Sequence, residues 1–106
     1  MRAGKLKHRV QIERYTEARD TTTGELDESW NVVDTVWANV RPLLGRERFQ
    51  AQQVKADITD EVSIRYYPGI TSKDRIRHND RLLLIEAVFN VAEETRETRI
   101  LCREQV

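Results

Sequence analysis

The feature that most constrains this fold is a series of short runs in which apolar and polar residues alternate. In residues 61–67, for example, Val62 and Ile64 alternate with polar neighbours. A period of two is typical of a β strand with one buried face. The predicted strands are residues 8–15, 30–40, 61–67, 73–78, 81–89 and 96–104. About six short strands at hairpin-like spacing predict a mainly β fold, a small antiparallel barrel or sandwich, since closure hides strand edges.

Turn signals separate these runs. Pro68-Gly69 and Asn79-Asp80 both favour tight turns, the second as a two-residue hairpin. The polar residues 16–29 are predicted to be a long connection within the first hairpin.

Aromatic residues in two of the runs allow further predictions. Tyr66 shares a face with Val62 and Ile64, which places it in the predicted core. Trp37 lies on the face opposite Val36, which indicates a strand covered on both sides.

Residues 46–56 differ from the rest of the chain. They follow Pro42, which ends a strand, and they are rich in Ala, Gln, Glu, Lys and Arg, which favour helices. Their apolar residues do not form a helical stripe. The segment is therefore either a short surface helix or a mobile polar segment.

Composition limits what the chain can be. Its 106 residues suit one domain, residues 1–106, with 18 basic and 18 acidic side chains and a formal net charge of zero. Zero net charge excludes a strong positive field for binding nucleic acid. Hydrophobic residues make up only 39% of the chain, so the core is modest and assembly with partners is expected. The start of the chain has no apolar stretch, which predicts a soluble protein with no secretory signal or membrane span.

The neutral total hides blocks of charge. Residues 1–14 and 65–81 are mainly basic, whereas residues 17–34 and 93–97 are mainly acidic. One interpretation is a solvated surface with local ion pairs. The other is a set of complementary faces that pair between copies of the chain.

Chemistry-bearing residues do not gather into a recognisable motif. His8 and His78 have no metal-ligand spacing, and the single cysteine, Cys102, allows no disulfide within the chain. We therefore predict no enzyme activity, catalytic residue, metal or cofactor. A barrel that binds single-stranded nucleic acid remains an alternative, with Arg65, Tyr67, Arg75 and Arg77 as its contact residues.

An ordered series of segments resembles the phage head–tail adaptor, or head-closure, family. The chain opens on a basic lead into a strand at residues 4–14, followed by a polar loop containing Gly24 and then Trp30. Its most recognisable stretch is Val-Trp-Ala-Asn-Val-Arg-Pro-Leu at residues 36–43, with Gly-Arg-Glu at 45–47. The chain departs from the family pattern at Leu44 and at the Asn79-Asp80 turn.

The resemblance implies a structural protein of the virion neck. Such a protein forms a homo-oligomeric ring beneath the portal, with a portal-side adaptor on one face, a tail or tail-completion protein on the other, and packaged double-stranded DNA in its channel. In stopper-type relatives, the segment after the second strand reaches toward that channel. The alternative is a tail-completion or tail-tube component.

Three sets of residues follow as predicted sites. The predicted gate segment, about residues 46–55, comprises Arg46, Arg48, Phe49, Gln50, Gln52, Gln53 and Lys55. The predicted docking loop comprises Asp20, Glu25, Asp27 and Glu28. The predicted basic face between subunits comprises Lys5, Lys7, Arg9, Arg75 and Arg77. An ordinary surface helix or flexible loop is the competing interpretation of the gate segment.

Overall fold

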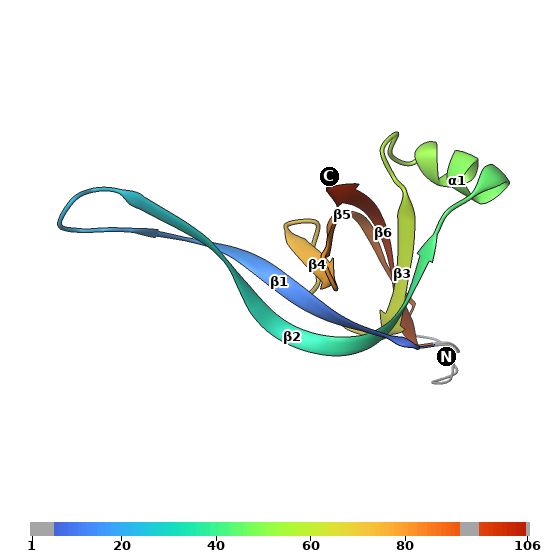
Figure 1. Ribbon diagram of the computed structural model, residues 1–106, viewed down its shortest axis with the longest axis horizontal. Coiled ribbons are helices and arrows are strands. Elements are labelled where there is room, and N and C mark those ends of the chain that lie inside the picture. The colour runs from blue at the N-terminus through green and yellow to red at the C-terminus, as the bar shows by residue number, and fades with distance from the viewer. Residues whose placement is uncertain (1–5, 92–95, 106) are drawn as a thin grey trace.

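A computed structural model describes residues 6–91 and 96–105, in which six strands and one helix follow one another (Figure 1). The elements are β1 (His8–Arg19), β2 (Leu26–Pro42), α1 (Gly45–Gln52), β3 (Asp60–Arg65), β4 (Asp74–His78), β5 (Arg81–Val91) and β6 (Glu97–Gln105). The six predicted strands are therefore present.

The strands form a closed antiparallel barrel in the order β1-β2-β3-β6-β5-β4. The barrel closes where residues 11–14 of β1 pair with residues 74–77 of β4, so that Ile12 lies opposite Ile76. Closure removes the open edges that a flat sheet of this size would expose. The predicted mainly β fold is confirmed, and of the two predicted architectures the barrel is the one that forms.

Inward-facing side chains fill the barrel. Its buried apolar cluster comprises Val10, Ile12, Ala38, Val40, Val62, Ile64, Ile70, Ile76, Leu83, Ile85, Ile100 and Cys102. A barrel this narrow has an interior just wide enough for such side chains. Burial also raises the pKa of the Cys102 thiol, which makes that thiol unreactive.

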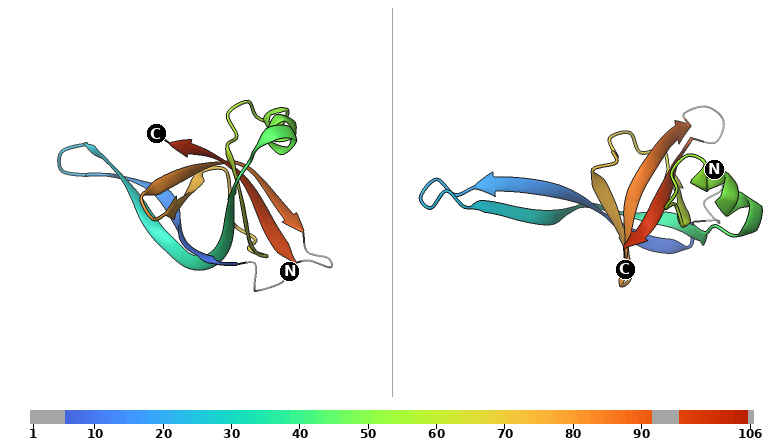
Figure 2. Two further views of the ribbon diagram at one scale, coloured as in Figure 1. Left: turned by 45° about the vertical axis from the view of Figure 1, so that its right-hand side comes forward. Right: turned by 90° about the horizontal axis from the view of Figure 1, so that it is seen from above.

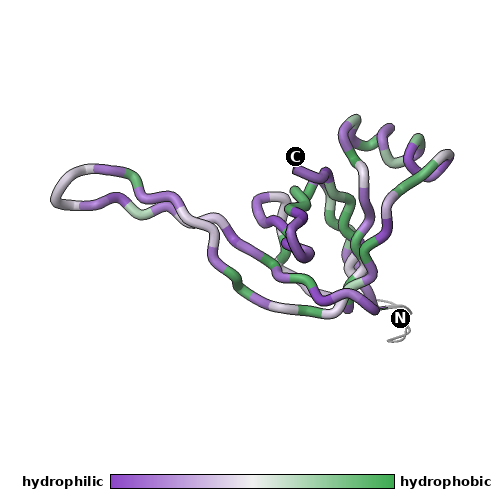
Figure 3. The backbone as a smooth tube through the Cα atoms, in the orientation of Figure 1, coloured by the Kyte–Doolittle hydropathy of each residue, from purple (hydrophilic) through white to green (hydrophobic). Residues whose placement is uncertain are grey.

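The first hairpin is far longer than the barrel needs. Residues 15–32, which we call the arm, extend away from the barrel as a two-stranded ribbon (Figures 1 and 2). The prediction that residues 16–29 are a connection was wrong, because the strands continue to Arg19 and resume at Leu26. Most side chains of the arm are exposed, so its sequence lacks apolar alternation and is largely hydrophilic (Figure 3).

A bulge in β2 marks the junction of barrel and arm. Ile12 pairs with Asp34 and Glu13 pairs with Val32, which leaves Val33 between them. The extra residue shifts the alternation of β2 by one. As a result, Trp30 in the arm and Trp37 in the barrel lie on the same outer face.

Two predicted turns are present, but two aromatic side chains are more exposed than predicted. Pro68-Gly69 and Asn79-Asp80 are turns, with Asn79 at φ 55°. Tyr66 was wrongly placed in the core: β3 ends at Arg65, Tyr66 is 41% exposed, and Tyr67 packs on the core instead. Trp37 is 52% exposed, so within this chain the outer face of β2 is not covered there.

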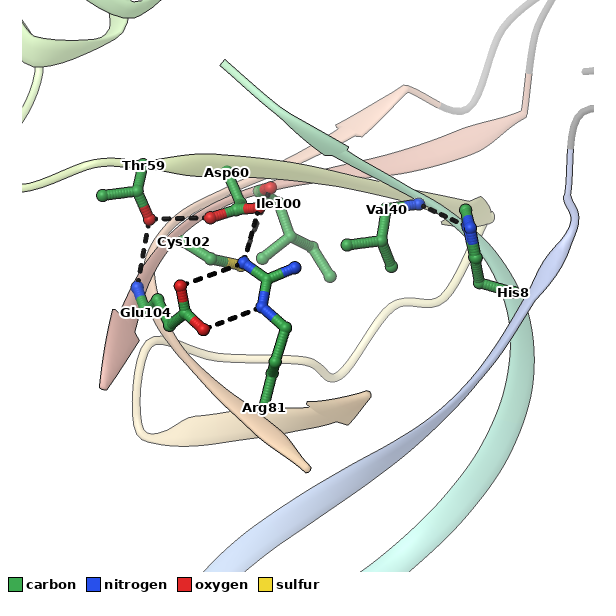
Figure 4. Close-up of polar contacts among 8 residues, drawn as sticks. All are labelled: His8, Val40, Thr59, Asp60, Arg81, Ile100, Cys102 and Glu104. Carbon is green, nitrogen blue, oxygen red and sulfur yellow. Dashed lines mark hydrogen bonds and ion pairs between the residues drawn. The ribbon is translucent and has the colours of Figure 1, made fainter. Parts of the chain in front are cut away.

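A buried polar cluster holds one end of the barrel together (Figure 4). Asp60 is 2% exposed and accepts hydrogen bonds from Thr59 Oγ1 at 2.7 Å and from Arg81 Nη2 at 3.0 Å. Arg81 Nε also donates to Glu104 Oε1 at 2.8 Å. Because these residues lie on or next to β3, β5 and β6, the cluster joins three strands.

The Asp60→Ala substitution is expected to lower the free energy of unfolding by about 2 kcal/mol, since it leaves Arg81 short of one buried partner. Arg81 is 36% exposed, which keeps the loss below that of a fully buried pair. Asp57→Ala makes the same change at an exposed turn residue and is expected to cost less than about 0.5 kcal/mol. Urea unfolding measures both variants, and equal losses would contradict the role of the cluster.

The two histidines form a second contact, between β1 and β4. Their rings meet edge to face, with centroids 4.9 Å apart. His8 Nδ1 also accepts the Val40 N–H at 3.2 Å, as Figure 4 shows. His78 Nδ1 is buried and has no hydrogen-bond partner among the described residues. Burial, and then the charges of His8 and Arg81, lower the pKa of His78 from its ordinary value of 6.5.

Stability is therefore expected to fall as the pH drops below about 6.5, because the unfolded chain then binds a proton that folded His78 resists. The contribution of neutral His78 to the free energy of unfolding is complete above about pH 6.5 and is lost as the pH falls through the lowered pKa of His78. A His78→Gln variant should show a flatter dependence of unfolding free energy on pH between about 6.5 and 5, where carboxylates titrate little. Identical slopes for the two proteins would show that His78 does not carry this dependence.

Candidate assembly surfaces

The outer face of the arm combines aromatic and acidic side chains. Tyr15 and Trp30 are cross-strand neighbours with ring centroids 5.4 Å apart. Beyond them, Glu17 lies directly opposite Glu28, and the Tyr15 hydroxyl donates to Glu17 Oε1 at 2.9 Å. Desolvation, and then the two glutamates, raise the pKa of Tyr15. Like charges directly opposite one another destabilise a strand pair, so a cationic side chain from another molecule would stabilise this face.

The tip of the arm holds the predicted docking loop. Asp20, Glu25, Asp27 and Glu28 are all exposed there. Asp20 also builds the turn, because its carboxylate accepts the Thr22 N–H at 2.8 Å, and such backbone bonds lower its pKa. Docking by these residues stays a prediction.

A groove of about 560 Å³ lies beside the barrel, where β2 and β3 diverge. Its lining includes Leu6, Arg9, Trp37, Ile64, Arg65 and Tyr66. The Arg9 guanidinium lies 4.9 Å from the centre of the Trp37 ring, a cation–π contact. Arg9 and Arg65 are exposed and form no ion pair with any residue that the structure describes.

The residues of the predicted basic face do not share one environment. Arg75 Nε and Arg77 Nε donate to Glu13 at 2.6 and 3.0 Å, so their charge is balanced within the chain. Burial alone would raise the pKa of Glu13, but the bonds from both arginines lower it. Lys7 and Arg9 are exposed, and Lys5 lies outside the described residues. A role for this face between subunits stays a prediction.

The predicted gate segment is a short surface helix, α1, and the turn that follows it. Ala51 seats the helix against Leu43 and Ile58. Gln52 is half-buried, while the other predicted gate residues, Arg46, Arg48, Phe49, Gln50, Gln53 and Lys55, are exposed. The helix is thus fixed at one point and presents polar side chains and Phe49 to the outside.

The predicted nucleic-acid contacts are dispersed. Arg65 is on β3 and Arg75 and Arg77 are on β4, and these strands lie on opposite sides of the barrel order. Tyr67 packs on the core, and its N–H donates to Thr98 Oγ1 at 2.8 Å. The structure therefore does not bring these four residues together.

Sequence reasoning named part of these surfaces and missed the rest. It identified the acidic tip and Arg9, but not the groove around Trp37 and Tyr66. The signal for the groove was Trp37 itself, a large apolar side chain on the face opposite the core.

Two further features concern metals and membranes. Within residues 6–91 and 96–105, no cluster of three or more His, Cys, Asp or Glu side chains is arranged to hold a metal ion. The same residues contain no helix with the length and apolar character needed to span a membrane.

Comparison with known proteins identifies the family. A solution structure of protein SF1141 from Shigella flexneri 2a is 32% identical, with a TM-score of 0.81 over 98% of this chain and 96% of that one. A chain in the virion of a native gene transfer agent particle shares the fold at 19% identity, with a TM-score of 0.62 over 95% of this chain and 96% of that one. No curated protein matches. The model of the phage head completion protein family matches residues 1–105. This chain therefore belongs to the phage head completion proteins, a family of structural virion proteins.

Proposed function

We propose that this protein forms a ring beneath the portal complex, joins the head to the tail and closes the DNA channel after packaging. The family match over residues 1–105 carries this proposal, because it places nearly the whole chain among proteins that complete phage heads. In the ring, one face meets the portal-side adaptor and the other meets the tail.

The DNA passage lies between copies of the chain. Each barrel is filled by its own apolar side chains, so it has no room for a duplex. A central axis surrounded by several copies supplies the opening instead. The zero net charge suits this role, because 18 acidic side chains offset the attraction of the 18 basic ones for DNA phosphates.

The exposed side chains of α1 and the following turn form the gate. Gln50 and Gln53 bond to the same residues of neighbouring copies around the axis without adding charge, and Phe49 fills space between them. The anchor at Ala51 supports this role, since it holds the segment on the outside of the barrel while leaving these side chains free.

DNA-filled, tailless particles that lack this protein test the proposal. Purified protein is added, and the nuclease-sensitive fraction of packaged DNA is followed over time. Protection is expected if the protein closes the head. Binding without protection would indicate an adaptor that joins but does not seal. No binding to heads, together with binding to purified tails, would contradict the proposal and favour a tail-completion component.

A gate variant with Phe49→Ala, Gln50→Ala and Gln53→Ala is expected to bind these particles normally but to leave several-fold more DNA sensitive to nuclease. It removes only exposed side chains and keeps Ala51, so the fold should be retained. Phe89→Ala is the matched control, because it truncates an exposed phenylalanine on β5, outside α1 and the turn that follows it. Full protection by the triple variant would refute the gate.

A further inference from the structure

We propose that the arm of each copy lies in the groove of the next copy, where the carboxylates of Glu17 and Glu28 meet the guanidinium groups of Arg9 and Arg65. This contact names the surfaces that join neighbours, and it rests on the proposed function only for its place in a ring.

Charge is the first argument. Most ionic side chains on the barrel strands are paired within the chain, as Arg75 and Arg77 are with Glu13. Glu17 and Glu28 instead face each other. Arg9 and Arg65 border the groove with no ionic partner among the described residues. Two unbalanced acids and two unbalanced bases on one chain are complementary when the chain meets a copy of itself.

Apolar surface is the second argument. On the arm, Leu26 and Trp30 share the outer face with the two glutamates and are exposed. In the groove, Trp37 and Tyr66 are also exposed, and they lie beside the two arginines. Each surface therefore has an apolar centre flanked by charge, which is the composition expected of a protein interface with a polar rim.

Free backbone is the third argument. Among residues 6–91 and 96–105, the pairing of β2 with β3 covers only Ala38–Pro42, and no other strand pairs with that edge of β2. The remaining length of β2 presents its other edge to the outside, from the arm up to the groove. An isolated two-stranded ribbon is marginal in water, so an arm of this length is expected to be covered by a partner.

Position supports a second copy as that partner. The arm projects from one side of the barrel, whereas the start of β1 and the end of β3, which border the groove, lie on the other side (Figure 1). The molecule is 51 Å long but only 28 Å and 25 Å across, and its arm extends away from its own groove (Figure 1). Contacts between two different surfaces run head to tail and close into a ring when the rotation permits.

Paired charge reversals test the contact. An arm variant, Glu17→Arg with Glu28→Arg, and a groove variant, Arg9→Glu with Arg65→Glu, should each weaken self-association, followed by sedimentation, by at least about tenfold. Mixing the two variants should restore assembly, because each reversed surface then finds a complementary one. A chain that carries all four changes should also assemble alone.

Reversal of exposed charges elsewhere is the control. Asp57→Arg with Asp80→Arg changes two exposed acidic residues outside both surfaces and should leave association unchanged. Thermal unfolding of every variant confirms that the barrel itself is retained.

Engineered cysteines locate the contact directly, both in solution and on the filled particles. Protein with Glu28→Cys mixed with protein carrying Arg65→Cys should form disulfide-linked dimers. A chain with both changes should form a ladder of linked copies. The native Cys102 is fully buried and adds little background.

Four results would overturn the arm–groove contact. Two concern the cysteines: no cross-links in solution or on the particles, or dimers formed by Glu28→Cys protein alone. The third is that mixing the two charge-reversal variants does not restore assembly. The fourth is salt-sensitive oligonucleotide binding that Arg9→Glu with Arg65→Glu abolishes while assembly persists. Protection of packaged DNA without cross-links would reject this contact but retain the proposed function. Cross-linked ladders that do not bind particles would support this contact but contradict the proposed function.

Discussion

The pairing of β1 with β4 is the constraint on which the rest of the structure depends. It brings residues 11–14 against residues 74–77, which are about sixty positions away, and closes the six-stranded sheet into a barrel. Only residues 11–14, in the middle of β1, take part in this ladder. The part of β1 that follows them and the facing part of β2 have no place in the barrel wall, so closure itself produces the arm.

Ion pairs across neighbouring strands explain how a chain with so many charged residues forms a compact barrel. Glu61, for example, accepts hydrogen bonds from Arg99 Nε at 2.9 Å and from Arg41 Nη2 at 2.6 Å, and it is almost fully buried beneath them. Arg41 also bonds to Glu47 and so links the barrel to α1. Such pairs use up most of the charge on the wall. Among the described residues, Glu17 and Glu28 on the arm and Arg9 and Arg65 at the groove remain outside these pairs.

Alternation predicted the barrel well because its strands bury one face and expose the other. It failed in the arm, where residues such as Thr16 and Ser29 are exposed and a strand leaves no periodic signal. It also failed at Tyr66, because β3 ends one residue earlier and the phase of burial passes to Tyr67. Of the candidate surfaces, the acidic tip was predictable from charge alone. The groove was not, since it requires β2 and β3 to diverge at Ala38.

The bulge at Val33 has a consequence for how relatives of this chain can vary. After the bulge, odd-numbered residues of β2 such as Trp37 face outward. Before it, even-numbered residues such as Trp30 face outward. One residue gained or lost at this junction would exchange the two faces of that half of the arm, with the amino acids of the arm unchanged. The partner of Tyr15 would then no longer be an outward Trp30. The presence or absence of one residue at the bulge, rather than the composition of the arm, therefore decides which side chains the arm presents to a neighbour.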